Sequence, residues 1–383
     1  MAFPRSKYVR EGQEGVYHCF SRCVRRAFLY GFDSVTLQDF SHRKAWLVQR
    51  LRFLATVFAI EVCAYAVMEN HYHTVLRTRP DIVALWSDWD AATRWLTLFP
   101  HHRDMSGTPI PPAEVDIRAL ADRPDRIAQL RIRLCSLSWF MGRLNEFIAR
   151  AANKEDSVKG RFWEARFKYQ ALLDEAAIAT CMVYVDLNPL RAGRAETPEE
   201  SDFTSIQERI RAWQKATRTS ASAPTEAAAL DMQAASVANA TPMPEITPEI
   251  PNPLPGRLAA MAHSFEGSAF PARWLCPIQS DAERRGILSM TAAEYFDLVD
   301  MSGRMTRSDK RATVDANLAP ILLRIGANPD AWLETVTRFG SKFRVAAGLL
   351  ANLRKFADQL GRRWLQGGAA ARTAFLPSLL QMG

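Results

Sequence analysis

The chain has 383 residues, which is long for one domain and predicts two. Its net charge of +8 and isoelectric point near 9.3 favour a polyanionic partner, nucleic acid first and an anionic membrane surface second. The sequence has no run of about 18 apolar residues, and its charged start lacks the apolar segment of a signal peptide, so we expect a cytoplasmic protein.

The N-terminal part alternates predicted strands and helices. Residues 15–24 (GVYHCFSRCV) predict a first strand, and residues 41–55 predict an amphipathic helix with Ser41 at its N-cap. Residues 61–68 and 71–78 predict two further strands. Only two residues separate this pair, which is the spacing of a β-hairpin.

A long insertion follows the hairpin and runs over about residues 80–158. It contains a predicted amphipathic helix over 81–98, a loop rich in Pro and Gly, and a longer helix over 126–152. Residues 160–172 (GRFWEARFKYQAL) then predict a fourth strand, in which apolar and charged side chains alternate between the two faces.

A helix is predicted over residues 174–187, and Asn188-Pro189 should end it because the residue before a proline disfavours the helical conformation. The order of elements is then β-α-β-β-insertion-β-α. This order is close to that of a ferredoxin-like or split-βαβ sheet, so the predicted fold class is α+β with an antiparallel sheet and packed helices.

The last part of the chain has a different character. Residues 215–255 are rich in Ala, Ser, Thr and Pro and predict a disordered linker. Residues 256–383 are nearly all helical in pattern, with a capping box from Thr291 to Glu294. They hold 17 Lys and Arg against 11 Asp and Glu, a net charge of 17 − 11 = +6. We expect a separately folded, basic accessory domain that adds affinity for DNA.

Four residues are candidates for chemistry: His71, His73, Tyr184 and Asn188. Positions i and i+2 of a strand point to the same face, so the two imidazoles lie side by side. Such a pair can share one metal ion, although two polar residues on a wet sheet face have the same spacing. Tyr184 and Asn188 are four apart on the predicted helix and therefore share a face.

Three blocks, AYAVMENHYHTVLR, GRFWEARFKYQALLDE and YVDLNPLRAG, occur in this order and resemble the REP-associated tyrosine transposases. These belong to the single-tyrosine HUH transposases of bacteria. The resemblance covers about residues 14–206, within a predicted domain of residues 1–214. It implies an HUH endonuclease fold, in which an antiparallel sheet carries the two histidines and the helix with the tyrosine packs beside it.

The resemblance also implies roles for the four candidates. Tyr184 falls on the nucleophile of the family, which forms a covalent 5′-phosphotyrosine. His71 and His73 fall on the histidine pair that holds Mg²⁺ or Mn²⁺, and Asn188 on a polar residue that completes the metal shell. The implied function is a metal-dependent endonuclease and strand transferase acting on single-stranded or hairpin DNA, as a monomer or a homodimer.

Basic and aromatic residues that interleave are candidate DNA contacts, because cations bind phosphates and aromatic rings stack on bases. The candidates are Arg22, Arg25, Arg26, Arg161, Phe162, Arg166 and Lys168. Trp163 and Phe167, in the same segment, are predicted to be core residues.

Two other functions fit parts of the pattern. The first is a hairpin-binding repressor that has lost catalysis, which the presence of His71, His73 and Tyr184 together argues against. The second is RNA binding on a ferredoxin-like sheet, for which the sequence lacks the paired aromatic strand motifs of an RNA-recognition motif.

Overall fold

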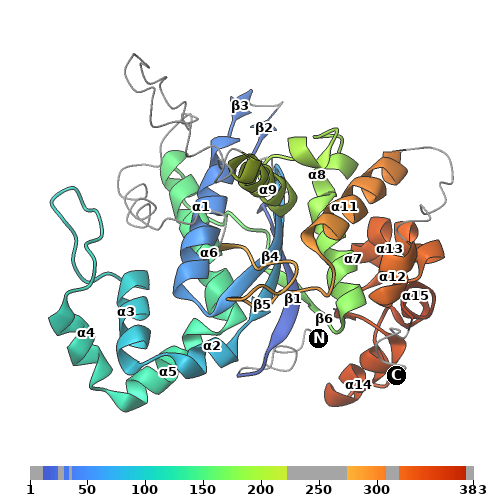
Figure 1. Cartoon of the computed structure of the whole chain (residues 1–383). Helices are drawn as coiled ribbons and strands as arrows, with labels where there is room; N and C mark the ends of the chain where they lie inside the picture. The colour runs from blue at the N-terminus through green and yellow to red at the C-terminus, as the bar shows by residue number, and fades with distance from the viewer. Residues whose placement is uncertain (1–11, 25–29, 34–36, 222–273, 308–318, 377–383) are drawn as a thin grey trace, which may run out of the picture.

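The computed structural model describes residues 12–24, 30–33, 37–221, 274–307 and 319–376. Within them, a five-stranded sheet with the strand order β4-β5-β1-β6-β7 lies between two groups of helices (Figure 1). The fold is mixed α+β, as the sequence predicts.

The strands of this sheet are β1 (Gly15–Arg22), β4 (Ile60–Val67), β5 (His71–Thr78), β6 (Lys168–Leu172) and β7 (Ala346–Ala347). All neighbours are antiparallel except β6 and β7, which are parallel. Strands β4 and β5 form the predicted hairpin, which the Met68 N–H closes by donating to the His71 carbonyl at 2.9 Å. A separate two-stranded sheet joins β2 (Phe32–Asp33) to β3 (Gln38–Asp39).

The alternation of side chains along β5 assigns the helices to the two faces of the sheet. On one face, the Tyr72 hydroxyl donates to Asn145 Oδ1 at 2.6 Å, and Asn145 belongs to α6 (Leu137–Glu155). Helix α1 (His42–Val57) packs with α6 on this side. His73 faces the opposite way, towards α7 (Glu175–Asp186). The predicted first helix and the predicted tyrosine helix are thus confirmed.

The insertion contains more helices than predicted. They are α2 (Pro80–Leu85), α3 (Asp88–Leu98), α4 (Glu114–Ala121), α5 (Pro124–Leu134) and α6, of which α3 and α6 pack on α1. The helix predicted over 81–98 is broken at Ser87. The Ser87 Oγ accepts from the Asp90 N–H at 3.1 Å, and this capping box starts a new helix. Helices α3, α4 and α5 enclose a small apolar core of their own.

The strand predicted over 160–172 is wrong in its first half, since only Lys168–Leu172 pairs as β6. The preceding residues are irregular, with one bridge from Trp163 to Cys23. Their alternation does not hold because Phe162 and Phe167 are both buried. The Trp163 indole N–H also donates to the Asn145 carbonyl at 2.9 Å, which ties this segment to α6 in addition to the end of β1.

After α7 the chain forms α8 (Asn188–Arg191), the 3₁₀ turn η3 (Pro198–Glu200) and α9 (Ser205–Ala221). Helix α9 therefore continues past residue 215, where the linker was predicted to begin. The remainder of the predicted linker lies outside the described residues.

The described C-terminal elements are α11 (Ala292–Arg307), α12 (Ala319–Arg324), α13 (Pro329–Lys342), β7, α14 (Leu350–Gln359) and α15 (Gly368–Ala374). The predicted capping box starts α11, with the Glu294 N–H donating to Thr291 Oγ1 at 3.1 Å. Both α11 and α13 pack on α7, which places them beside the sheet (Figure 1).

The described C-terminal residues do not form a core of their own. Leu275 bridges to Val62 on one edge of the sheet, and β7 pairs with β6 at the other edge. Buried residues of α11, α13 and α14 belong to the same apolar cluster as those of β4, β5 and α7. These described residues therefore complete the core around the sheet and do not form the separate accessory domain that was expected.

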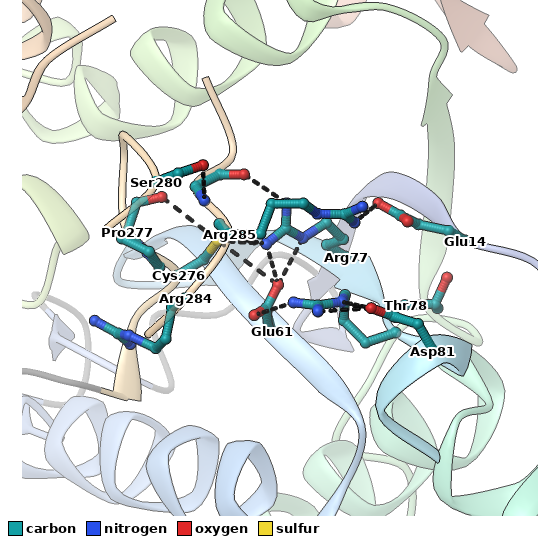
Figure 2. Close-up of polar contacts among 12 residues, drawn as sticks. Glu14, Glu61, Arg77, Thr78, Asp81, Cys276, Pro277, Ser280, Arg284 and Arg285 are labelled. Carbon is teal, nitrogen blue, oxygen red and sulfur yellow. Dashed lines mark hydrogen bonds and ion pairs between the residues drawn. The ribbon is translucent and has the colours of Figure 1, made fainter. Parts of the chain in front are cut away.

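A buried ion network fastens the segment before α11 to the sheet, as Figure 2 shows. Arg77 of β5 is 2% exposed. Its guanidinium donates to Glu61 Oε2 at 2.6 Å and to the carbonyls of Gly286 and Arg285 at 2.8 and 2.6 Å. Because a buried guanidinium needs its hydrogen bonds satisfied, displacing this segment would leave Arg77 partly unpaired.

Candidate active site

The two histidines of β5 meet a third histidine from β1. His71 and His73 lie on one face with ring centroids 5.0 Å apart. His18 lies on the neighbouring strand, where Phe20 pairs with His73. The His18 Nε2 is 2.9 Å from His73 Nδ1, and the rings of these two histidines are stacked with centroids 5.1 Å apart. His18 was not among the residues predicted for the site, although it lies in the first predicted strand and points to the same face as Phe20 two residues on.

Tyr184 reaches this histidine cluster from α7. Its ring centroid is 5.7 Å from that of His73 and 5.9 Å from that of His18. Helix α7 is anchored at its start by Asp174, whose Oδ1 accepts from the Ala177 N–H at 3.1 Å. Three of the predicted site residues, His71, His73 and Tyr184, thus come together although Tyr184 lies more than 100 positions after His73 in the sequence.

A cavity of about 1050 Å³ opens over these side chains. Among the described residues that line it there is no Asp or Glu, whereas it has seven cationic side chains: Arg22, Arg166, Lys168, Arg191, Arg338, Arg344 and Arg362. A smaller cavity of about 550 Å³ shares His71 with it, but Glu69, Glu200 and Asp202 line that one. The larger cavity is therefore the one suited to an anionic ligand.

The hydrogen bonds of the two β5 histidines leave the same nitrogen of each ring available. His71 Nδ1 is 2.6 Å from Asn70 Oδ1, which can only accept, so His71 carries its proton on Nδ1. His18 Nδ1 faces Gln170 Oε1 at 3.4 Å, so His18 is protonated there and its Nε2 accepts from His73 Nδ1. Both β5 imidazoles then present an unprotonated Nε2, the form that binds a metal ion.

Burial keeps these imidazoles neutral. It lowers the pKa of His71 to about 4, with the Arg22 charge acting in the same direction. It lowers the pKa of His18 to about 4 as well, and the hydrogen bond to Gln170 opposes the shift. The pKa of His73 lies well below its ordinary value through burial, then through the neighbouring His18 and His71. Protonating a buried imidazole would cost desolvation energy, because the charged form loses contact with water.

Arg191 is a further neighbour of the phenol that the sequence analysis missed. Its guanidinium carbon lies 5.0 Å from the Tyr184 ring centroid, and its Nη2 donates to the Thr337 carbonyl of α13 at 2.6 Å. Burial raises the pKa of Tyr184, and the Arg191 charge opposes that rise by stabilising the phenolate. The available signal was its position seven residues after Tyr184, just past the predicted helix stop.

Helix α13 covers the phenol from the C-terminal side. A Cβ on Gly340 would lie 3.1 Å from the Tyr184 hydroxyl oxygen, so the hydroxyl packs directly against this glycine. The Phe339 ring lies 5.8 Å from the Tyr184 ring. The candidate nucleophile is half-buried between β5 and α13, with its environment set by both ends of the chain.

Asn188 does not join the histidines. Its side-chain amide donates to the carbonyls of Tyr184 at 3.0 Å and Val185 at 3.4 Å, which satisfies the C-terminal end of α7. It is also absent from the residues that line the cavity. The expectation that Asn188 shares a metal with His71 and His73 is therefore not met, because the amide is engaged by its own helix.

The predicted DNA contacts divide into four groups. Arg22, Arg166 and Lys168 line the cavity, whereas Arg161 is exposed but not part of its lining. Phe162 cannot stack on a base, since it is 3% exposed and packs edge-on against Tyr30 in the core. Arg25 and Arg26 lie outside the described residues. Phe167 is a core residue as predicted, and Trp163 is half-buried.

The donor set decides what the site can hold. Among the described residues, no group of three or more His, Cys, Asp or Glu side chains is arranged so that all of them could bind one metal ion. Two neutral imidazoles with free Nε2 atoms fit a divalent ion that takes its other ligands from substrate oxygens and water. They do not form a closed structural site, which needs about four protein ligands.

Comparison with family models and with curated proteins finds no match. Among solved structures, one described as a REP-associated tyrosine transposase bound to a REP hairpin is similar over 55% of this chain and 86% of that chain. The two are 12% identical, and the TM-score is 0.28. No helix within the described ranges has the length and apolar character needed to cross a lipid bilayer. The assignment of a function therefore depends on the residues of the site.

Proposed function

We propose that this protein is a metal-dependent enzyme that cleaves and rejoins strands of single-stranded or hairpin DNA, with Tyr184 as the nucleophile. The observation that supports it most is the placement of the Tyr184 ring 5.7 Å from His73 in a cavity lined by cations and by no described carboxylate. An anionic phosphodiester fits such a cavity, and a phenol beside two metal-ready imidazoles fits transesterification.

His71 and His73 would hold the ion, Mg²⁺ or Mn²⁺, through their Nε2 atoms. When bound, the ion would neutralise charge on the oxygens of the scissile phosphate. Asn70 and His18 act behind them, because each fixes the proton of its partner on Nδ1. Burial lowers the pKa of His71 and His73, so protons do not compete with the ion for their Nε2 atoms at neutral pH.

Tyr184 attacks the phosphorus through its hydroxyl oxygen. The bond from this oxygen to phosphorus forms as the bond to the 3′-oxygen of the leaving strand breaks, which gives a 5′-phosphotyrosine and a free 3′-hydroxyl. The proton lost by the phenol is balanced by the one gained by that hydroxyl. Arg191 favours the phenolate electrostatically, and the phosphodiester energy is retained, so a new 3′-hydroxyl can reverse the step.

The test is a covalent-adduct assay. Labelled single-stranded circles and hairpin-forming oligonucleotides are incubated with Mg²⁺ or Mn²⁺, and protein that carries label after denaturation is mapped by peptide sequencing. We expect the adduct on Tyr184, its loss in Tyr184→Phe, and its loss with EDTA. Tyr169→Phe, an identical change on the same cavity, should still form the adduct.

A non-catalytic hairpin-binding protein is the competing function. One observation favours it: the Tyr184 hydroxyl is packed against Gly340, as the hydroxyl of a structural tyrosine would be. If hairpin DNA binds but no adduct forms with either metal, or if the adduct maps to Tyr169, the proposal of a Tyr184 nucleophile is refuted.

A further inference from the structure

The C-terminal region supplies one complete side of the cavity over the histidines. Eight of its residues line this cavity, and they come from the last turns of α13, from the turn into β7 and from the segment after α14: Thr337, Arg338, Gly340, Ser341, Phe343, Arg344, Val345 and Arg362. None of the motifs that identify the candidate site lies in this region, so nothing in the proposed chemistry explains why it is there.

This side of the cavity is basic, like the side opposite. Arg338, Arg344 and Arg362 lie on the C-terminal side, and we call these three residues the arginine wall. Arg338 approaches Glu334 at 3.7 Å, but both side chains are more than 60% exposed, so this pair holds the guanidinium only weakly. Like charges gathered around one cavity repel each other, and an anion placed between them removes that cost.

The wall is held in place beside the sheet. The Ala171 N–H of β6 donates to the Val345 carbonyl at 2.9 Å, directly after Arg344. Asp174, at the start of α7, accepts from the Leu349 N–H at 2.6 Å and from the Asn352 amide at 2.9 Å. Because the backbone around the arginines is fastened at these points, the cavity exists before any ligand binds, and little ordering is needed on binding.

We propose that the arginine wall binds the sugar-phosphate backbone of the DNA strand that Tyr184 attacks, opposite the cations of the sheet side, Arg22, Arg166 and Lys168. This inference rests on the proposed function for the identity of the strand. A cavity of about 1050 Å³ matches the upper end of small-ligand sites, so it takes a few nucleotides of one strand and excludes a double helix. The half-buried Phe20 ring in the same cavity offers a base a face to stack on.

The experiment measures binding without cleavage. Every protein carries Tyr184→Phe and is assayed in EDTA, so catalysis and metal play no part. The wall variant is Arg338→Ala/Arg344→Ala. The control is Arg354→Ala/Lys355→Ala on α14, which removes the same charge from exposed positions of the same region that do not line the cavity. Affinity for a fluorescein-labelled 20-nucleotide single strand, and for the matching blunt duplex, is measured over a range of salt concentrations.

Each phosphate contact to a single strand contributes about 0.7 to the slope of log affinity against log salt, so the wall variant should lose roughly 1.4 from this slope. The control should keep the slope of the parent. Duplex affinity should be the same for the wall variant and the control. Circular dichroism checks that both variants keep the fold.

Equal losses of slope in the two variants would mean that only net charge matters, and this would overturn the proposal. An unchanged slope in the wall variant, or an equal loss with the duplex, would overturn it too. The adduct assay separates this failure from failure of the proposed function. If the native chain forms its Tyr184 adduct while the wall variant binds normally, the nucleophile stands and the wall does not.

Discussion

Replacing Gly340 with alanine tests whether the position of the Tyr184 hydroxyl matters for cleavage. The new Cβ would lie 3.1 Å from the hydroxyl oxygen and 3.6 Å from Cζ of the ring, with no other atom outside the helix within 4 Å. The substitution therefore presses on one side chain only. The phenol must move by a few tenths of an ångström, towards the cavity, for the methyl group to fit.

The expected effects on stability and on cleavage have opposite signs. An alanine in the interior of a helix is favoured over glycine by about 1 kcal/mol. Gly340 lies in the last turn of α13, past a kink at Arg338, so only part of this gain applies, and the strain of one tight contact offsets some of it. The free energy of unfolding should therefore stay unchanged or rise by roughly 0.5 kcal/mol. Because a displacement of 1 Å in an active site costs on the order of a hundredfold in rate, a shift of a few tenths should cost roughly threefold to tenfold.

Urea unfolding followed by fluorescence gives the stability, and the single-turnover rate of adduct formation gives the cleavage. Gly142→Ala in α6 is the matched control, because a Cβ there meets nothing within 4 Å. It should raise stability and leave the adduct rate at the native value. If Gly340→Ala also forms the adduct at the native rate, the hydroxyl is not positioned by α13 and the reasoning is wrong.

Three further predictions follow from the titrating groups and the shared core. Burial lowers the pKa of His71 to about 4, so Mn²⁺ binding measured by calorimetry should persist down to about pH 5. Binding should vanish in His71→Ala, and its loss near pH 6.5 in the native chain would contradict the lowered pKa. Burial raises the pKa of Asp186 to about 6, so its contribution to stability is present at low pH and is lost as pH rises through about 6. Relative to Asp186→Asn, the native chain should lose roughly 3 kcal/mol of unfolding free energy between about pH 4 and pH 7, and a difference independent of pH would refute this. A chain that ends at Trp213 exposes the apolar side of α7, so it should lack the sharp unfolding transition of the full chain; a cooperative transition would show that the N-terminal part folds alone.

Local patterns in the sequence predicted the parts of the site that depend on local geometry. Alternation along a strand placed His71 and His73 on one face, and the two-residue connection predicted the hairpin that carries them. The helical pattern of residues 174–187 and the stop at Asn188-Pro189 predicted α7 with Tyr184 on it. These features follow from backbone conformation over a few residues, which the residue types of that stretch determine.

The neighbours of these residues were decided by tertiary packing. His18 contacts His73 across 55 positions of sequence, and Arg191 contacts Thr337 across 146. No period relates such positions, because their meeting depends on strand order and on how α13 packs against α7. Packing of α11 and α13 against α7 likewise makes the described C-terminal residues part of the core and of the cavity, whereas their composition predicted a separate domain. Asn188 shows the converse. It lies near Tyr184 in sequence, as the pattern indicated, but its amide donates to the carbonyls at the end of α7 and not to the site.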